Sequence, residues 1–226
     1  MEMKLVSSIV IDLRMNFNVI LGMCDRRFTL ANREEILDIT AFNYGDEHVE
    51  EKVRDCQRTP MQWTSEAAHA GFTSSQTKPF LPLADTWYEL NVEQQQKTTR
   101  SHLKLFQQLV QLRQQSPFYG GHQKKVIAKK EYYAFIRWLE QNIYLIVINM
   151  TKKDHQSMTI DFCHLLKYRE NELLGEVVAR SCNVSDRSPI GQEGNQVNLK
   201  KLTLQSSEAV VFKLLISPEE IPFCQS

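Results

Sequence analysis

The sequence predicts an α+β chain in which a helical or irregular N-terminal half is followed by an all-β half. The first observation is an amphipathic helical pattern at residues 100–115. The second is the segment before this helix, which contains many charges and prolines and has no sustained period. The third is a change to alternating aromatic and β-branched residues after the helix. We therefore expect a domain boundary near residue 117.

Residues 1–97 contain three kinds of sequence. Residues 7–21 are rich in Val, Ile, Leu and Phe and predict one or two short strands. Residues 32–58 are dense in charged side chains, which is typical of a solvated helix or loop. Residues 59–97 contain Pro60, Pro79 and Pro82. Proline removes a backbone donor and restricts the residue before it, so this segment predicts irregular structure. A long irregular loop in a compact domain is often functional.

The helix at residues 100–115 is predicted from an apolar stripe with i, i+3, i+4 and i+7 spacing. The stripe consists of Leu103, Leu105, Phe106, Leu109, Val110 and Leu112. Thr99 or Ser101 is expected to cap the N-terminus by accepting a backbone N–H bond. Pro117 and the pair Gly120-Gly121 end the helix.

Short strands dominate the prediction for residues 117–226. Residues 132–139 and 143–149 read as a hairpin, because a polar turn separates two runs of aromatic and β-branched residues. Further strand-like runs lie at residues 158–162, 176–181, 196–204 and 209–215. Such strands, joined by polar turns, predict an antiparallel sandwich or barrel.

The overall composition excludes several functional classes. Apolar residues make up 42% and charged residues 24%, as in ordinary globular proteins. Lys plus Arg and Asp plus Glu both number 27, so the zero net charge gives no electrostatic case for nucleic acid or an anionic membrane surface. No apolar run is long enough to cross a bilayer. Asp12 and Arg14 interrupt the apolar stretch 7–23, so we expect no signal peptide there.

The sequence also contains no motif that predicts a metal site, a cofactor site or a catalytic nucleophile. The five cysteines show no CxxC pairing and no histidine at metal-ligand spacing, so no metal site is predicted. The six histidines are scattered, and neither a GxSxG motif nor a phosphate-binding glycine loop is present. No cofactor is therefore expected. Two acceptor sequons for N-glycosylation begin at Asn149 and Asn183, and they matter only if the chain enters the secretory pathway.

The most specific segment is a ten-residue block, RDCQRTPMQW, at residues 54–63. AGF follows at 70–72, FLP at 80–82 and NVE at 91–93. This series resembles the loop before the last barrel helix of family 13 α-glucosidases, which include maltases and oligo-1,6-glucosidases. The family pattern is RDxxRTPMQW, AGF, WLP and NVE in the same order. The resemblance extends from about residue 32 to about residue 216.

The resemblance implies a division of the chain into three parts. Residues 1–31 remain unassigned. Residues 32–116 correspond to the end of a (β/α)8 catalytic barrel, with the motif loop and the last barrel helix. Residues 117–226 correspond to the antiparallel β-sandwich that forms the C-terminal domain in this family.

The resemblance also implies roles for individual residues. The arginine directly before TPMQW points into the pocket for the terminal glucose in this family, so Arg58 is expected to bind substrate. An arginine fork suits this task because it can donate to two neighbouring hydroxyls. Arg54 and Asp55 are expected to pair and hold the loop. Trp63 is expected to pack in the core beneath the loop.

The catalytic carboxylates of this family are missing from the sequence. Retaining glycosidases need two carboxylates about 5–5.5 Å apart. The resemblance places the nucleophile Asp, the acid/base Glu and a third Asp upstream of the motif, whereas only 53 residues precede Arg54 and no NHD signature occurs. The adjacent pairs at residues 34–35 and 50–51 do not share a helix face and are read as solvated charge. We therefore expect no catalytic residue and no activity of this chain alone.

Three interpretations remain open. The first is the C-terminal portion of an α-glucosidase, which would bind an α-glucoside sugar once the barrel is complete. The second is a non-enzymatic relative, the heavy subunit of heteromeric amino-acid transporters, which would have a membrane-protein partner. The third is a free-standing carbohydrate-binding sandwich with strand aromatics exposed on one face. Full-length members are secreted or membrane-associated, and the sequence leaves the location of this chain open.

A consequence for stability follows from the missing barrel strands. The apolar stripe of the helix at 100–115 normally packs on them, so it must be exposed or find another surface. We expect the β half to be the more stable part.

Overall fold

The computed structural model describes residues 26, 28–151, 157–170 and 172–224. The strands predicted at 7–21 lie outside these residues. The chain divides into two compact units, with the boundary in the sequence between Lys104 and Leu105. We call the described residues 26–104 the loop unit and the described residues 105–224 the sheet unit. Within the described residues, none of the helices is long and apolar enough to cross a membrane.

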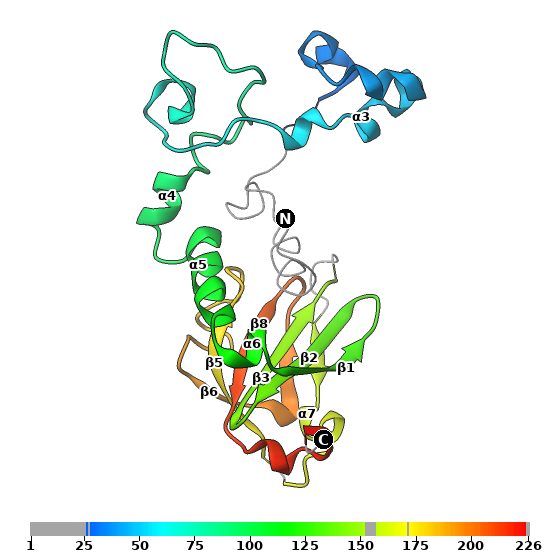
Figure 1. Cartoon of the computed structure of the whole chain (residues 1–226), viewed down its shortest axis with the longest axis vertical. Helices are drawn as coiled ribbons and strands as arrows, with labels where there is room; N and C mark the ends of the chain where they lie inside the picture. Colours follow the sequence, from blue (N-terminus) through cyan, green and yellow to red (C-terminus); the bar gives the residue numbers. More distant parts are fainter. Residues whose placement is uncertain (1–25, 27, 152–156, 171, 225–226) are drawn as a thin grey trace. The chain divides into compact units, whose positions relative to one another are not determined.

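The loop unit has short helical turns and no strand among its described residues (Figure 1). Its α-helices are α3 (Val49–Lys52) and α4 (Val92–Lys97). Its 3-10 helices span Leu30–Glu35, Ile39–Tyr44, Asp46–His48, Asp55–Gln57 and Ala68–Gly71. The prediction of irregular structure for residues 59–97 is confirmed for most of the segment, but it missed the 3-10 helix Ala68–Gly71 and α4 at Val92–Lys97.

A small apolar core lies within the charge-dense part of the loop unit. It contains Phe28, Ile36, Ala41, Val49, Val53 and Leu81, all of which are buried. Most charged side chains between them face solvent, as predicted, with two important exceptions: Asp38 and Asp55 are buried. Helical turns are short here because the core residues Phe28, Ile36, Ala41 and Val49 do not follow a regular spacing of three or four residues, so they form no continuous helical stripe.

Helix α5 (His102–Arg113) confirms the predicted amphipathic helix. Ser101 caps it, since its Oγ accepts the N–H of Lys104 at 3.2 Å. Ser101 Oγ also donates to the carbonyl of Gln95 at 2.8 Å, and the Gln95 side chain accepts the N–H of Leu103 at 2.9 Å. Two free N–H groups of the first turn therefore obtain partners.

The sheet unit is built on a six-stranded antiparallel sheet in the order β1-β2-β3-β8-β5-β6 (Figure 1). The strands are β1 (His122–Ala128), β2 (Tyr132–Leu139), β3 (Asn142–Asn149), β5 (Leu174–Arg180), β6 (Gln196–Asn198) and β8 (Ala209–Leu214). A separate pair joins β4 (Met158–Ile160) to β7 (Leu202–Leu204). Short helices α6 (Ser116–Tyr119) and α7 (Phe162–Leu165) and 3-10 turns at Leu199–Lys201, Pro218–Glu220 and Pro222–Cys224 complete the unit.

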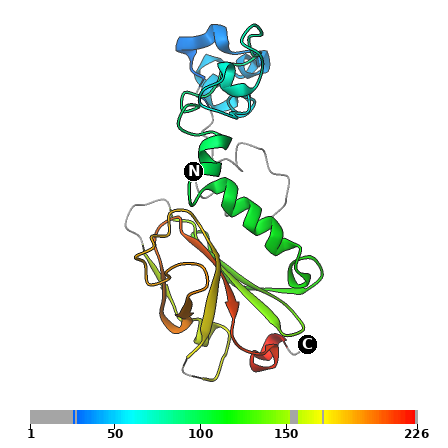
Figure 2. The ribbon, with the colours of Figure 1, turned by 90° about the vertical axis from the view of Figure 1, so that its left-hand side faces the viewer.

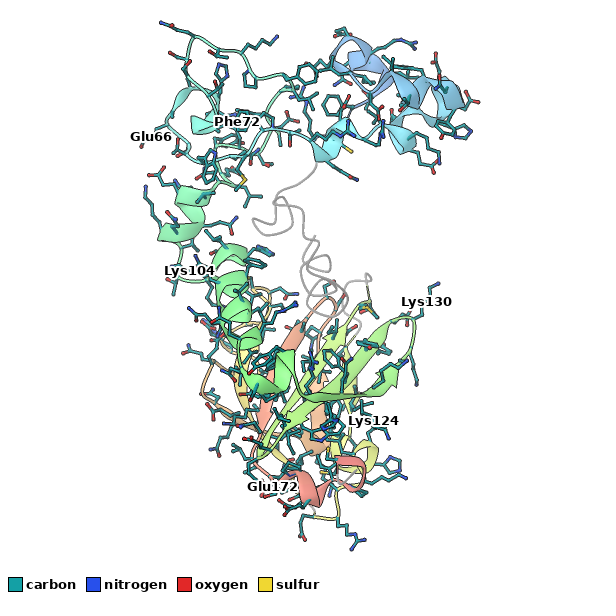
Figure 3. The ribbon with its side chains drawn as sticks, viewed as in Figure 1. Glu66, Phe72, Lys104, Lys124, Lys130 and Glu172 are labelled. Carbon is teal, nitrogen blue, oxygen red and sulfur yellow. The ribbon has the colours of Figure 1, made fainter. Side chains whose placement is uncertain are left out.

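The predicted strands are found with small differences, and the hairpin at residues 132–149 is confirmed by antiparallel pairing of β2 and β3. Residues 196–204 form two strands separated by a turn rather than one. The prediction missed β1, an edge strand whose residues 122–125 are exposed and polar. Lysines protect such edges against pairing with another chain. Figure 3 shows Lys130, in the turn after β1, pointing away from the sheet.

The core of the sheet unit lies against one face of the six-stranded sheet. Phe212, Ile136 and Leu145 are fully buried there. The two-stranded sheet contributes Met158, Leu202 and Leu204 to the same core, and α7 contributes Phe162 and Cys163. β3 is buried along most of its length on both faces, as expected for a central strand.

The other face of the sheet is covered by α5 and α6, so the apolar stripe of α5 finds a surface within the sheet unit (Figure 2). Leu105 and Leu109 face Ile146 and Val211 across a small cavity of about 20 Å³. Gln108 donates to the carbonyl of Val178 at 2.7 Å. Because most of α5 packs on this sheet, the boundary between the two units falls within the first turn of α5, between Lys104 and Leu105.

The strand aromatics are not available as an exposed binding face. Phe135, Trp138 and Tyr144 are buried, while Tyr132 and Tyr133 are half-buried. Tyr144 packs against Phe118 of α6 with ring centroids 4.8 Å apart, and its hydroxyl bonds to the Gln115 side chain at 2.5 Å. A carbohydrate-binding sandwich would require aromatic side chains exposed on one face of the sheet, and these strand aromatics do not provide such a face.

Gly120→Ala and Gly121→Ala provide a matched test of packing at the start of β1. A Cβ on Gly121 would lie 2.5 Å from the Trp138 carbonyl oxygen and 2.6 Å from that of Pro117, whereas one on Gly120 would meet only the Ser116 carbonyl at 3.8 Å. We expect Gly121→Ala to lower the free energy of unfolding by about 1–3 kcal/mol, because backbone must move. Gly120→Ala should change it by less than about 0.5 kcal/mol. Urea unfolding measures both, and equal midpoints would contradict the packing described.

Candidate functional site

Three of the four sequence motifs in the loop unit meet through backbone hydrogen bonds. The carbonyl of Ala70, in AGF, accepts the N–H groups of Trp63 and Thr64 at 2.9 and 3.1 Å. The carbonyls of Gln62 and Trp63 accept the N–H groups of Val92 and Glu93, in NVE, each at 3.0 Å. The end of the RTPMQW block is thus held on two sides by segments that follow it in the sequence. We call this arrangement the motif junction.

The AGF motif adopts a strained backbone at the junction. His69, Ala70 and Gly71 have φ values of 51°, 53° and 70°, all in the left-handed region. This conformation costs a residue with a side chain roughly 1–2 kcal/mol, and glycine at the third position avoids that cost. Ala70 is fully buried, and the turn directs its carbonyl to two donors at once. The small residues of AGF are therefore explained by local geometry.

Asn91 explains why NVE follows at a fixed place. Its side chain caps α4 by accepting the N–H of Gln94 at 2.9 Å, and its amide donates to the carbonyl of Trp87 at 3.0 Å. Asn91 is fully buried, so both contacts are shielded from water. The cap begins α4 directly where Val92 and Glu93 bond to the junction.

A second anchor holds the start of the RDCQRTPMQW block, residues 54–63. Arg54 forms a two-pronged ion pair with Asp38, with Nε and Nη2 each 2.7 Å from a carboxylate oxygen. Asp55 accepts the backbone N–H groups of Leu37 and Asp38, both at 2.7 Å. The prediction that Arg54 pairs with Asp55 is therefore wrong in its partner. Both residues hold the loop as expected, but each does so through residues 37–38.

The contacts of Asp38 keep it ionised. The hydrogen bonds from Arg54 and Thr40 hold the pKa of the Asp38 carboxyl far below its usual range, although burial of the group opposes this. Asp38 is 5% exposed. A buried carboxylate with this many donors stabilises the fold only while it is charged.

Arg58, the predicted substrate-binding residue, lies on the surface of the loop unit. It follows the 3-10 helix Asp55–Gln57, and its backbone N–H bonds to the Asp55 carbonyl at 3.0 Å. Within the described part of the chain, its guanidinium has no hydrogen-bond or ion-pair partner. Asp55 thus anchors the backbone directly before Arg58, while the side chain keeps its donors available.

The neighbouring side chains of the block differ from expectation. Trp63 is 46% exposed, so the prediction that it packs in the core is wrong. Its backbone is tied to the junction while the indole lies at the surface. Gln62 is instead fully buried, and within the described residues neither its Oε1 nor its Nε2 has a hydrogen-bond partner. The same holds for the buried Thr59 hydroxyl.

A separate open cleft of about 460 Å³ lies in the loop unit. Its lining includes Arg26, Lys78, Asp85, Trp87 and Tyr88, and it does not include Arg58. Arg26 bridges this region by donating to the Leu83 carbonyl at 3.0 Å and by pairing with Glu35 at 2.6 Å. The structure therefore does not place the predicted substrate residue in this cleft.

The local carboxylate pairs do not have the properties of catalytic acids. Hydrogen bonding from Asn32, aided by Arg26, lowers the pKa of Glu35, and Lys52 lowers that of Glu51. A general acid near neutral pH needs the opposite shift. No cluster of three or more metal-ligating side chains occurs in the described part of the chain.

The buried thiols do not have the properties of nucleophiles. Burial raises the pKa of Cys163, and it raises that of Cys224 to about 11. A thiol acts as a nucleophile in its ionised form, which these shifts disfavour. Both side chains instead pack in the core of the sheet unit.

Sequence reasoning missed the role of Asp38. It lies in a charge-dense segment, where one carboxylate among many carries no distinguishing signal. Its burial comes from the apolar neighbours Ile36 and Ala41, which pack in the small core of the loop unit. The position of Asp38 between the apolar residues Ile36 and Ala41 was the one feature of the sequence that could have indicated its burial.

Asp38→Asn tests the anchor through its pH dependence. Because the folded-state pKa of Asp38 is lowered, its stabilisation is fully present above the unfolded pKa of about 3.9 and is lost as pH falls through the folded value. We expect Asp38→Asn to speed hydrogen exchange of peptides covering residues 37–55 at least roughly tenfold between pH 5 and 7, since bonds to charged groups contribute about 1.5–3 kcal/mol. The difference should shrink below about pH 4.

Asp46→Asn is the matched control for this experiment. Asp46 pairs with Arg33 at 3.0 Å, but both side chains are more than half exposed, so the change should be small. Mass spectrometry of exchanged peptides, corrected for intrinsic rates, gives both values. Equal exchange in the two variants would contradict the role given to Asp38.

Comparison with known proteins places these motifs in a family. Residues 21–120 match the sequence profile of the family described as "Alpha amylase, catalytic domain". Maltase 1 of Drosophila virilis is 34% identical over 146 residues, which cover 64% of this chain and 22% of the relative. Maltase A1 of Drosophila melanogaster is 32% identical over 162 residues, covering 71% and 26%. The oligo-1,6-glucosidase of Bacillus cereus is 27% identical over 210 residues, covering 86% and 34%.

Solved structures support the same fold. The trehalulose synthase MutB of Pseudomonas mesoacidophila superposes with a TM-score of 0.63 at 23% identity, over 86% of this chain and 34% of that one. A variant of MutB with bound Tris gives a TM-score of 0.67 at 19% identity, over 94% and 38%. This chain spans about a fifth to a third of the length of the curated relatives above. From its motifs and these relatives, the chain belongs to glycoside hydrolase family 13, among the α-glucosidase-like members.

Proposed function

We propose that this chain is the C-terminal portion of an α-glucosidase that acts on α-glucosides, and that Arg58 contacts the sugar. The observation that carries the proposal is the motif junction together with the Asp38 anchor. These hold the RDCQRTPMQW block at both ends and leave Arg58 exposed. An arginine fork can donate to neighbouring sugar hydroxyls. Maltases and oligo-1,6-glucosidases among the relatives favour α-glucosides as the substrate class.

Within this proposal, the loop unit and α5 correspond to the end of the catalytic barrel. The sheet unit from β1 onward corresponds to the C-terminal β-sandwich, with the six-stranded and two-stranded sheets as its layers. The shared core of Phe212, Leu145, Leu202 and Leu204 supports this assignment, since side chains from both sheets fill it.

We propose further that activity requires the remainder of the barrel. The motifs of the catalytic carboxylates do not occur in this sequence. Of the ten large apolar side chains exposed among the described residues, eight lie in the loop unit. They are Leu30, Leu37, Ile39, Tyr44, Trp63, Phe72, Phe80 and Tyr88. The buried polar atoms of Gln62 and Thr59 without partners support the same idea. Both features suit a surface that packs against more of the domain.

The enzyme interpretation is favoured over the transporter subunit. The relatives reported above carry the names of maltases and glucosidases. The RTPMQW block occurs in both classes, so the block itself does not separate them. Hydrolysis of an α-glucoside separates them.

A chimera with Maltase A1 tests the proposed function. The purified chain alone should not hydrolyse maltose or a nitrophenyl α-glucoside. A Maltase A1 whose matching C-terminal segment is replaced by this chain should hydrolyse both. The reason is that the chimera supplies the two carboxylates that retaining hydrolysis needs. Hydrolysis by the chain alone, or a folded chimera without activity, would contradict the proposal.

Arg58 is tested in the same chimera. We expect Arg58→Ala to lower kcat/KM about 10- to 200-fold, the effect of about 1–3 kcal/mol of lost hydrogen bonding to substrate. Arg58→Lys should recover only part of it, since an ammonium lacks the fork. Glu34→Gln and Glu50→Gln, at exposed positions of the same unit, should leave kcat/KM unchanged. An unchanged kcat/KM in Arg58→Ala would remove the residue from the site.

Limited proteolysis tests the stability expected of the two units in the chain alone. The sheet unit buries a continuous core, whereas the loop unit relies on a small one and on side-chain anchors. We expect cleavage within residues 32–97 to occur first and to leave a resistant fragment from about α5 onward. Mass spectrometry of the fragments identifies the sites. Equal resistance of residues 32–97 would show that the loop unit needs no further partner.

A further inference from the structure

The two N-glycosylation sequons have different environments, and Asn149 is a structural residue. It ends β3 and is fully buried. Its Nδ2 donates to the carbonyl of Leu204 at 3.2 Å. Its Oδ1 accepts both the backbone N–H and the hydroxyl of Thr151, at 3.1 and 2.8 Å. The sequon's own threonine is therefore used to close a local turn.

A sugar on Asn149 is incompatible with this fold. Thr151 is also buried, and its carbonyl accepts the hydroxyls of Ser206 and Ser207 at 2.6 and 3.1 Å. An oligosaccharide attached to Asn149 Nδ2 would have to occupy the space between β3 and the segment around Leu204. It would break the bond to Leu204 and expose this network.

Asn183 is presented in the opposite way. It occupies the third position of a turn closed by the bond from Val184 N–H to the Ser181 carbonyl at 3.1 Å. Its side chain is exposed, and its Oδ1 accepts the Ser181 hydroxyl at 2.5 Å. Among the described residues, its Nδ2 makes a single long contact of 3.5 Å, with the Ser206 carbonyl. The amide is thus oriented mainly through its oxygen, on an exposed side chain.

The rest of this sequon fixes the turn without burying the acceptor. Val184 is fully buried, and its carbonyl accepts Nη1 of Arg180 at 3.3 Å. Arg180 itself is buried and pairs with Asp186 and Glu193. Ser185 is exposed. Anchored residues on both sides therefore hold Asn183 and Ser185 at the surface.

We propose that Asn183, and not Asn149, is an N-glycosylation site of this protein when it enters the secretory pathway. The ligand class is an oligosaccharide delivered on a polyisoprenyl diphosphate carrier. In the transfer, Asn183 Nδ2 forms a bond to the sugar C1, the C1–O bond to the diphosphate breaks, and one amide proton passes to a base of the transferase. Nδ2 keeps its second hydrogen, and Oδ1 keeps its bond to Ser181. The inference stands on its own beside the proposed function.

The test is expression of the full chain behind a cleavable secretion signal in eukaryotic cells. The secreted, protease-resistant protein should carry one glycan, seen as a single shift in mass that a peptide N-glycosidase removes. Enzymatic release in heavy-oxygen water converts a glycosylated Asn to labelled Asp. The label should lie at Asn183 and be absent from Asn149.

Three variants sharpen this result. Asn183→Gln and Ser185→Ala each disrupt the sequon at an exposed position, and both should abolish the mass shift. Ser188→Ala, in the same loop but outside the sequon, should retain it. Label at Asn149 in folded protein, or secreted protein without label at Asn183, overturns the inference. Because Asn149 is never mutated, a failure to fold does not confuse the outcome.

Discussion

Every buried backbone polar group needs a partner, and this requirement is met differently in the two units. The sheet unit satisfies it through strand ladders. The loop unit has no strand among its described residues, so carbonyls and carboxylates do the same work. One carbonyl, that of Ala70, accepts two donors, and the carboxylates of Asp38 and Asp55 accept three backbone donors. The position of Arg58 depends on these few contacts.

Much of the sheet unit could be predicted because its strands alternate apolar and polar residues or are buried throughout. β2 and β3 follow directly from that pattern. β1 could not be found in the same way, because most residues of this edge strand are exposed to solvent and polar, so they show no apolar alternation. The division of the chain was also hidden. The stripe of α5 indicates a partner surface, but the sequence does not say that the partner is the sheet that follows.

The candidate site was predictable as a motif and not as a set of contacts. The order of the motifs predicted that they belong together, and the backbone bonds explain the spacing. The partner of Arg54 was misjudged because Asp38 is distant in sequence while Asp55 is adjacent. Trp63 was misjudged because aromatic residues are usually buried, yet here the backbone holds the position and the indole is exposed. Reasoning from sequence uses mainly the residues adjacent in the chain, whereas the burial of a side chain depends on contacts between residues that are distant in the sequence.

The lysines of the β1 edge affect whether the sheet unit, separated from the rest of the protein, would associate with other copies of itself. A six-stranded sheet with an unpaired edge would add strands from other copies and grow into fibres. Lys124 and Lys125 place like charges along that edge, and the register shift between Lys125 and Ile127 bends it. The opposite edge, β6, has only the three residues Gln196–Asn198. A sheet with these edges has the features of one that stays soluble as a single copy, so it is a suitable part for recombination with other domains.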